Sequence, residues 1–250
     1  MNLLVLFLLY AVALTGVLAR SGYRSRSGAA PQSVSAHRRP SRLLIIGATG
    51  GTGRQLVAQA LERGFTVTAL VRDPTRLAVV HPKLAVVVGD VLDPGSVDAA
   101  MRGQEAVVCA LGHRRYFSAA RILSEGTRNV LRSMEVHGIA RFVCETSLGI
   151  GDSAGRMGLY YTFFTIPVVL PLYFGDKCRQ ERLIAASGME WVIVRPGRLI
   201  DGEKRGRYRH GRDAGSFLRT VRISRADVAD FMLNQLTSDA YVRRAPRVCW

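Results

Sequence analysis

The segment Leu43–Gly53, with the sequence LLIIGATGGTG, decides the fold of this 250-residue chain. A short apolar run leads directly into three glycines at three-residue spacing, Gly47, Gly50 and Gly53. In a dinucleotide-binding turn the first glycine permits a tight bend, the second lets the backbone approach a diphosphate, and the third lets the next helix pack closely on the strand. The N–H groups at the start of that helix then face the anion. Glycine-rich turns also end strands for purely steric reasons, so the motif needs its context.

The residues after the glycines supply that context. Arg54–Arg63 carries apolar residues at helical spacing and ends before Gly64, a helix stop signal. Phe65–Val71 then has the composition of a second buried strand. A strand, glycine turn, helix and strand within one short segment form the βαβ unit that a dinucleotide requires. The residues expected to contact the diphosphate are Gly47, Thr49, Gly50, Gly51, Thr52 and Gly53.

The end of the second strand predicts which dinucleotide binds. An acidic residue at this position would accept a hydrogen bond from the ribose 2′-hydroxyl, whereas arginine would meet a 2′-phosphate. The strand ends in Arg72, and Arg76 follows four residues later, so two guanidiniums are available for bidentate pairing with a phosphate. This pattern favours NADP. Asp73, the next residue, is an acid of the kind that accepts a hydrogen bond from the ribose hydroxyl, so NAD is the alternative.

The alternation of strands and helices continues along the chain. Further strands are predicted at 84–88, 106–111, 142–144 and 191–194, with helices at 94–102, 120–137 and 176–187. We therefore expect an α/β fold, a single Rossmann-type domain with a doubly wound parallel sheet over residues 42–250. Ligands of such sheets bind at the carboxyl ends of the strands. The residues expected there, in the same crevice as the glycine turn, are Asp90, Val91, Leu111, Gly112, Ser147 and Pro196.

Cysteine usage and composition limit the class of protein. Of the residues, 48% are hydrophobic, which is enough for a full core in one enzyme-sized domain. The cysteines have no CxxC spacing, and two lie within predicted buried strands, which favours reduced thiols in an intracellular fold over a disulfide framework or a zinc site. They are Cys109, Cys144, Cys178 and Cys249. We expect no metal site.

The net charge of +16 raises the question of a nucleic-acid partner. Six of the arginines precede the predicted domain or stand at its first residue: Arg20, Arg24, Arg26, Arg38, Arg39 and Arg42. A second basic cluster, Lys204–Arg212, suits a solvated loop, or a site for phosphate, anionic lipid or an acidic substrate. Aromatic residues interrupt it only at Tyr208, so no stacking platform for single strands is indicated. We expect a small-molecule substrate and no nucleic acid.

Residues 1–19 form a separate hydrophobic segment. Leu3–Ala19 carries no charge and lies at the short end of the length that spans a bilayer, so it predicts an anchor or a targeting segment and possible membrane association through residues 3–19. Basic residues follow the segment, which places the domain on the cytoplasmic face of a membrane. Residues 20–41 are rich in Arg and Ser and predict a disordered linker or a transit region. An organelle location and a soluble cytoplasmic location are the alternatives, and the oligomeric state is not predicted.

An ordered series of motifs runs from about Arg42 to Val248. It consists of GATGGTG (47–53), LVRDPTRL (70–77), VVGDVLDPGSV (87–97), SEGTRNV (124–130), TSLGIG (146–151), DKCRQERLIAASGMEWVIVRPGRL (176–199) and ISRADVADF (223–231). With these motifs in this order, the chain resembles the atypical short-chain dehydrogenase/reductases. Within them it is similar to the NAD(P)H-binding group that includes flavin reductase and biliverdin-IXβ reductase. The resemblance implies that Arg72 and Arg76 hold the 2′-phosphate. It also implies that Asp90 and Val91 flank the adenine, and that Gly112 and Ser147 lie near the nicotinamide.

Candidate catalytic residues follow from a Tyr-x-x-x-Lys spacing at Tyr173 and Lys177. Residues four apart share a helix face, so the ammonium can lower the pKa of the phenol and help it to donate a proton. Ser147 is the candidate to hydrogen-bond a substrate oxygen. Tyr173 also closes the apolar run 159–174, which suits packing or a lid of a loop and a short helix over the crevice. Pro167 and Pro171 argue against a regular spanning helix there.

These features predict an oxidoreductase that transfers hydride from NADPH to a small organic acceptor such as a flavin, a quinone or a conjugated carbonyl. The alternative is a protein that binds NADP without turnover, as a redox sensor or a scaffold, because a fold does not fix a function. Both alternatives have the same requirements at the phosphate end of the site.

Overall fold

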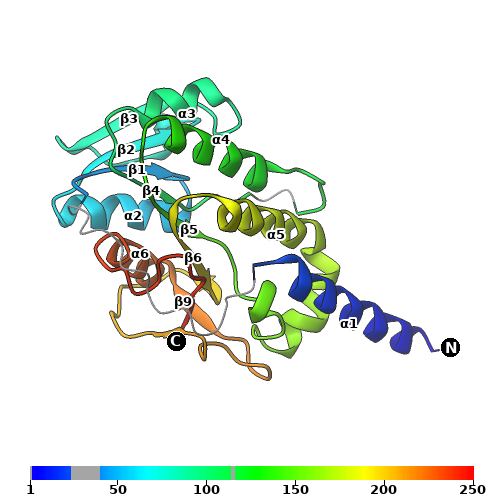
Figure 1. Cartoon of the computed structure of the whole chain (residues 1–250). Helices are drawn as coiled ribbons and strands as arrows, with labels where there is room; N and C mark the ends of the chain where they lie inside the picture. Colours follow the sequence, from blue (N-terminus) through cyan, green and yellow to red (C-terminus); the bar gives the residue numbers. More distant parts are fainter. Residues whose placement is uncertain (1, 24–39, 114–115) are drawn as a thin grey trace.

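The computed structural model of the chain describes residues 2–23, 40–113 and 116–250. A sheet of eight strands forms its centre, in the order β3-β2-β1-β4-β5-β6-β10-β8 (Figure 1). The strands are β1 (Arg42–Ile46), β2 (Thr66–Val71), β3 (Leu84–Val88), β4 (Ala106–Cys109), β5 (Arg141–Glu145), β6 (Glu190–Pro196), β8 (Arg209–Gly211) and β10 (Arg247–Cys249). All neighbours pair in parallel except β10 and β8, which are antiparallel. The Rossmann-type fold expected from the sequence is thus confirmed.

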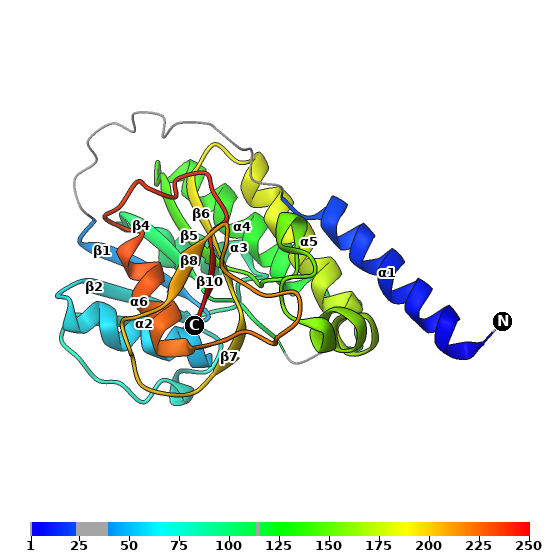
Figure 2. The ribbon, with the colours of Figure 1, turned by 90° about the horizontal axis from the view of Figure 1, so that it is seen from below.

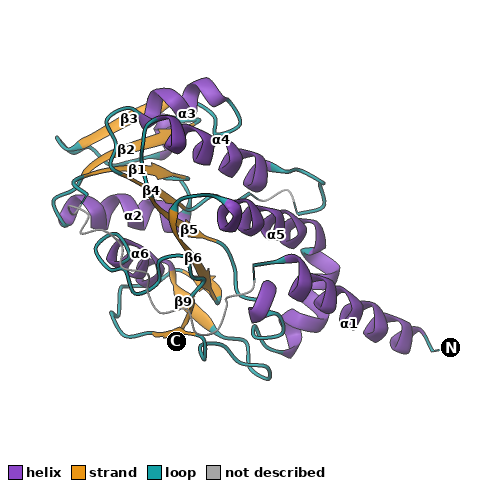
Figure 3. Ribbon diagram, in the orientation of Figure 1, coloured by secondary structure: helices purple, strands orange, loops and turns teal. Residues whose placement is uncertain are grey.

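Helices cover both faces of the sheet, as a doubly wound fold requires (Figure 3). The helices are α1 (Leu3–Ser21), α2 (Gly51–Glu62), α3 (Pro94–Met101), α4 (Ile122–Val136), α5 (Pro171–Ala186) and α6 (Arg225–Asn234). Shorter helical segments are η1 (Pro74–Arg76), η2 (Gly151–Ser153) and η3 (Tyr161–Val169), the last a π-helix. Helices α2 and α6 pack on one face, and α3, α4 and α5 pack on the other.

Strand β1 explains why its sequence is apolar without alternation. Leu43 and Ile45 join the core cluster under α2 and α6, whereas Leu44 and Ile46 join the cluster under α3, α4 and α5. All four side chains are buried. A parallel strand that is covered on both faces has no polar side, so its sequence becomes one continuous apolar run.

Several elements differ from the sequence-based expectations. Strands β8 and β10, and a small second sheet of β7 (Arg198–Ile200) and β9 (Arg222–Ser224), lie in segments for which no strand was predicted. Helix α5 begins at Pro171, five residues before the predicted start at Asp176. Proline is well suited to a first helical turn, because the N–H group that it lacks has no partner within the helix there. Tyr173 and Lys177 therefore share one helix.

The N-terminal hydrophobic segment forms α1, which projects from the body of the molecule (Figure 2). Its second half is packed against the domain: Ala11 and Leu18 are buried, and the Tyr10 hydroxyl donates a hydrogen bond to the Pro167 carbonyl at 3.0 Å. In the described part of the chain, α1 alone is long and apolar enough to cross a membrane. Residues 24–39, most of the predicted linker, lie outside the described residues.

A buried guanidinium joins the end of α1 to the sheet. Arg195 on β6 is fully buried, and it donates to both carboxylate oxygens of Glu181 on α5, at 2.9 and 2.7 Å. It also pairs with Asp152 and donates to the backbone carbonyl of Tyr23 at 2.7 Å. The Tyr23 ring packs edge-on against Trp191, with 4.9 Å between ring centroids. Burial opposes the charge of Arg195, but the neighbouring carboxylates prevail and raise its pKa.

We predict that Glu181→Gln lowers the free energy of unfolding by about 3 kcal/mol, because it leaves Arg195 buried without its main counter-charge. Urea denaturation followed by circular dichroism measures the change. The control is Arg128→Ala, which removes an exposed ion pair with Glu125 and should change stability little, because solvent screens such pairs. Equal effects of the two variants would contradict a structural role for the buried pair.

Candidate coenzyme and acceptor site

The glycine turn between β1 and α2 has the close approaches that its spacing predicts. Gly47 has a φ of +82°, and a Cβ placed on it would lie 2.5 Å from the Ala110 carbonyl oxygen. The Gly50 N–H donates to the Gly47 carbonyl at 3.0 Å. A Cβ on Gly53 would lie only 2.0 Å from the same carbonyl oxygen. Side chains are therefore sterically excluded from the first and third glycine positions.

Helix α2 begins with N–H groups that no side chain caps. Its N-cap residue is Gly50, and the helix starts at Gly51, earlier than the predicted Arg54. Thr52 is buried, and its hydroxyl donates to a carboxylate oxygen of Glu145 at 3.2 Å. The first N–H groups of a helix have no partner within it, and together with the positive end of the helix dipole they favour an anion. The turn suits a diphosphate.

The side chain of Arg225 also lies at this turn. The sequence analysis did not predict it as a site residue. A Cβ on Gly51 would lie 2.4 Å from Cδ and 2.5 Å from Nε of Arg225, the first residue of α6. The guanidinium is held by Asp201 at 2.7 Å. Arg225 lies within the ISRADVADF motif, but nothing in its spacing indicates that it reaches the turn after β1.

The loop after β2 presents the predicted arginines to solvent. Arg72 and Arg76 are exposed, and the Arg54 guanidinium donates to the Arg76 carbonyl at 3.4 Å. The Asp73 carboxylate accepts hydrogen bonds from the N–H and the hydroxyl of Thr75, at 3.0 and 2.6 Å. These bonds lower the pKa of Asp73 and engage its carboxylate in the turn. Arg54 is a third guanidinium at this corner, beyond the two that were predicted.

Two of the predicted residues, Val91 and Leu111, meet at Gly126 on α4. A Cβ on Gly126 would lie 2.8 Å from a methyl group of Val91 and 3.4 Å from one of Leu111. The Asp90 carboxylate accepts from the Leu92 N–H at 3.0 Å and fixes the loop after β3. The loops after β3 and β4 thus both reach Gly126 on α4.

Of the predicted catalytic residues, Tyr173 and Lys177 are in contact, and Ser147 forms its hydrogen bond within its own loop. A Cβ on Gly112 would lie 3.6 Å from the Tyr173 hydroxyl oxygen, so the phenol lies beside the loop after β4. The Lys177 ammonium lies over the face of the Tyr173 ring, 5.2 Å from its centroid. The Ser147 hydroxyl donates to the Leu148 carbonyl at 3.0 Å. Among the described residues, no hydrogen bond links Ser147, Tyr173 and Lys177.

Lys177 and Glu145 are both buried and interact electrostatically, without a direct ion pair among the described residues. Both side chains are in the protein interior. Burial opposes the charge of Lys177, but Tyr173, Glu145 and other neighbours outweigh it and raise the pKa of the ammonium. Burial also raises the pKa of Glu145, although Lys177 and the Thr52 hydroxyl act in the opposite direction. Lys177 therefore remains a cation at neutral pH. Glu145 was not predicted, because a single acid at the end of a strand gives no distinct signal.

The predicted lid has a different form. Residues 161–169 form the π-helix η3, and residues 171–174 form the first turn of α5. Ile166 and Phe174 pack against Gly149 on the loop after β5, and the π-helix packs along α1. Pro196 ends β6 nearby, and its carbonyl accepts from the Leu148 N–H at 2.9 Å.

The cysteines and the basic cluster lie outside this group. All four cysteines are buried and unpaired, and burial raises the thiol pKa of Cys178 to about 12. Within the described residues, no group of three or more His, Cys, Asp or Glu side chains is placed to hold a metal ion. The loop 204–207 is exposed, and the buried Asp227 carboxylate accepts from the N–H groups of Arg205 and Gly206.

Comparison with known proteins identifies the class. Residues 47–239 match the NAD(P)H-binding family model, and the chain belongs to this family. It is 32% identical over 173 residues to an uncharacterized chloroplast protein of Arabidopsis thaliana, covering 63% of this chain and 59% of the relative. It is 31% identical over 206 residues to a 3-diazoavenalumate denitrifying reductase of a Streptomyces species, covering 72% of this chain and 62% of the relative. The chain thus spans about three fifths of the length of these relatives.

The fold is also that of solved oxidoreductases. A short-chain dehydrogenase/reductase from Veillonella parvula, in complex with NADP, superposes with a TM-score of 0.71 at 18% identity, over 84% of this chain and 94% of the other. The resemblance inferred from the motifs is therefore confirmed for the family and the fold.

We predict that Gly53→Ala weakens NADPH binding by more than about tenfold, because the new methyl group displaces the turn that faces the diphosphate. Tryptophan or coenzyme fluorescence titration measures the affinity. Gly188→Ala is the matched control, since a Cβ there meets nothing within 4 Å. Unchanged affinity in Gly53→Ala would place the diphosphate elsewhere.

Proposed function

We propose that this protein is an NADPH-dependent oxidoreductase that transfers hydride to a small organic acceptor. One observation carries the proposal: the uncapped N-terminus of α2 lies behind a glycine turn, with Arg225 beside it. A diphosphate needs this combination of free N–H groups, close backbone approach and positive charge. The family match and the reductase relative support the same class.

NADP is the proposed coenzyme. Arg72 and Arg76 are exposed at the tip of β2, and Arg54 lies beside them. Asp73, the residue that favoured NAD, accepts two hydrogen bonds from Thr75 within its own turn. A carboxylate that is engaged in this way is a poorer partner for a ribose hydroxyl, whereas guanidiniums pair well with a 2′-phosphate. The NADP in the Veillonella parvula structure supports this assignment.

The bound nicotinamide would supply the hydride. The chain contributes orientation and charge: the α2 N-terminus and Arg225 hold the diphosphate, and Gly112 leaves space beside the Tyr173 hydroxyl. Lys177 places a buried cation at the acceptor side, where it favours the negative charge that develops on a reduced acceptor. The exposed arginines at the tip of β2 fix the opposite end of the coenzyme.

Flavins, quinones and conjugated carbonyls are the proposed acceptor classes. The Lys177 ammonium lies over the Tyr173 ring rather than at its hydroxyl, so it does not activate the phenol through a direct hydrogen bond. This arrangement favours acceptors whose reduced form can take its proton from water. The Ser147 hydroxyl is available to such an acceptor after rotating away from the Leu148 carbonyl.

The location is proposed to be a membrane, with α1 as the attachment. The chloroplast location in the name of the Arabidopsis relative supports the organelle alternative.

We expect Arg72→Glu to weaken NADPH binding by about tenfold to a hundredfold and to leave NADH binding nearly unchanged, because only NADPH carries the 2′-phosphate. Isothermal titration calorimetry with both coenzymes measures the two affinities. Arg132→Glu, an equal charge change at an exposed position of α4, is the control. The NADP assignment fails if Arg72→Glu and Arg132→Glu bind NADPH equally well.

We expect Tyr173→Phe to keep most of the NADPH oxidation rate with a flavin or a quinone, and Lys177→Met to lower it more than about tenfold. Absorbance of NADPH over an acceptor panel, including a ketone, measures turnover. A large loss in Tyr173→Phe would instead make the phenol the proton donor. Tight NADPH binding with no turnover of any acceptor would favour the alternative, a sensor or scaffold protein.

A further inference from the structure

Helix α1 has two halves with different environments. Beyond Tyr10 it is bound to the domain, through the Tyr10 hydroxyl on the Pro167 carbonyl and through the buried side chains of Ala11 and Leu18. The segment before Tyr10 has no buried side chain, and its exposed apolar residues are Leu3, Leu4, Val5, Leu6, Leu8 and Leu9, whereas beyond Tyr10 one face is bound and the other exposes Val12 and Val17. At about 1.5 Å per residue this segment is roughly 10 Å long, whereas the hydrocarbon core of a bilayer is about 30 Å thick. The free part of α1 is too short to cross a membrane.

Exposed apolar side chains of the domain surround the base of this segment. They are Leu159, Tyr160, Phe164, Val168, Leu172, Phe217 and Leu218, and we call them the apolar rim. Tyr160 stacks on Phe164 with 5.5 Å between ring centroids, and the Leu159 N–H donates to the Leu218 carbonyl at 3.5 Å. The apolar rim therefore joins η3 to the loop before β9. Exposed apolar patches of this kind mark binding surfaces for proteins or membranes.

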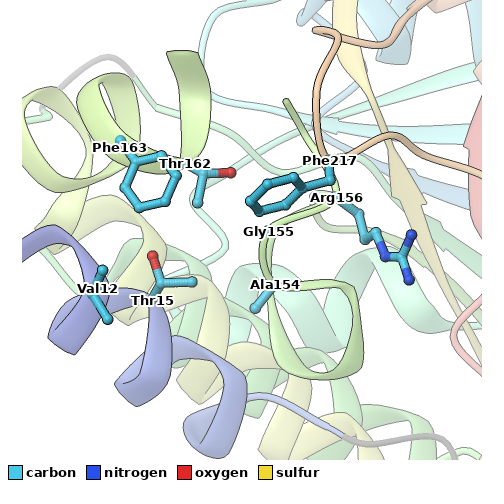
Figure 4. A pocket seen from close by; sticks show the side chains of 8 residues that line it. All are labelled: Val12, Thr15, Ala154, Gly155, Arg156, Thr162, Phe163 and Phe217. Carbon is cyan, nitrogen blue, oxygen red and sulfur yellow. The ribbon is translucent and has the colours of Figure 1, made fainter. Parts of the chain in front are cut away.

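A cavity of about 410 Å³ connects α1 with the apolar rim. Val12 and Thr15 of α1 form one wall, and Phe163 and Phe217 lie on either side of the space (Figure 4). The volume falls within the range of pockets that hold small molecules, about 300–1,000 Å³. Val12, Phe163 and Phe217 form an apolar side that suits a hydrocarbon chain, and Thr15, Thr162 and Arg156 add polar groups to the lining.

Two exposed arginines border the apolar rim. Arg156 precedes η3, and Arg219 follows Leu218 directly. The two segments are joined by a hydrogen bond from the Ser216 N–H to the Arg156 carbonyl, at 2.9 Å. In the part of the chain that the structure describes, neither guanidinium has a carboxylate within ion-pair distance. Cations at the edge of an apolar surface complement the phosphates of anionic lipids.

We propose that α1 does not span a membrane but enters one leaflet by its first turns, and that the apolar rim rests on the same anionic bilayer. Arg156 and Arg219 then lie at the level of the headgroups, and the cavity beside Val12 takes up one acyl chain. The free segment of about 10 Å is shorter than one leaflet, which is about half of the roughly 30 Å hydrocarbon core. The proposal concerns attachment and does not depend on which acceptor is reduced.

Depth-dependent quenching tests the proposal on the full-length protein. Single cysteines are introduced by Leu6→Cys, Phe217→Cys and, as the control, Val136→Cys on α4, whose side chain is 73% exposed. All four native cysteines are buried, so an environment-sensitive dye labels the new sites. The probes are vesicles of phosphatidylcholine and phosphatidylglycerol with brominated acyl chains. We expect quenching at positions 6 and 217 and none at 136.

Several outcomes would overturn the proposal. Quenching at position 6 alone would mean that α1 is the sole attachment. If the fluorescence of the dye at position 217 changes with protein concentration in the absence of vesicles, a second copy of the chain covers the apolar rim. Protection of a label at Asn2 from a membrane-impermeant quencher outside the vesicles, with exposure to the same quencher inside, would mean that α1 spans the bilayer.

Charge reversal gives an independent measurement. Arg219→Glu should reduce partitioning onto the anionic vesicles by about tenfold and have little effect with vesicles of phosphatidylcholine alone. Arg132→Glu, on an exposed part of α4, is the matched control and should partition like the parent protein. NADPH affinity, measured in parallel, verifies that each variant is folded. Equal partitioning of the two variants would exclude Arg219 from the lipid surface.

Discussion

The contact between Gly47 and Gly53 is the constraint on which the coenzyme end of the molecule depends. A Cβ on Gly53 would lie 2.0 Å from the Gly47 carbonyl, so α2 can start this close to β1 only because the side chain is absent. The approach directs the first N–H groups of α2 into the crevice and brings Arg225 over Gly51. Without it, the carboxyl edge of the sheet would have no place for a diphosphate.

The region around Tyr173 and Lys177 is organised by buried charge rather than by close backbone contact. Arg195 of β6 forms an ion pair with Glu181 of α5, and Lys177 of α5 is buried where Glu145 of β5 acts on it electrostatically. Burying a charge is costly unless a partner compensates it. Removing one member of a buried ion pair therefore leaves the remaining charge buried and uncompensated. Helix α5 therefore has a fixed position, and with it Tyr173 and Lys177.

The sequence predicted β1 to β6 and the glycine turn because the physics there is local. A parallel strand covered on both faces is a continuous apolar run, and a turn without room for Cβ atoms needs glycine. Arg225, Glu145 and the contacts of Arg195 could not be predicted in this way, because each is separated in sequence from the groups that it meets. The short strands β7 to β10 carry no distinct sequence pattern. Strand β7 precedes the basic cluster and β8 lies within it, so both belong to one arginine-rich segment. The position of Lys177 over the Tyr173 ring likewise depends on side-chain orientation that residue spacing does not specify.

The contact of Arg195 with the Tyr23 carbonyl has a consequence for processing of the chain. Tyr23 is held by this bond and by the Trp191 ring, and α1 is held by Ala11, Leu18 and Tyr10. A protease that cut between Tyr23 and Pro40 would sever the backbone without removing these interactions. The helix and the domain would then still be joined by these non-covalent contacts.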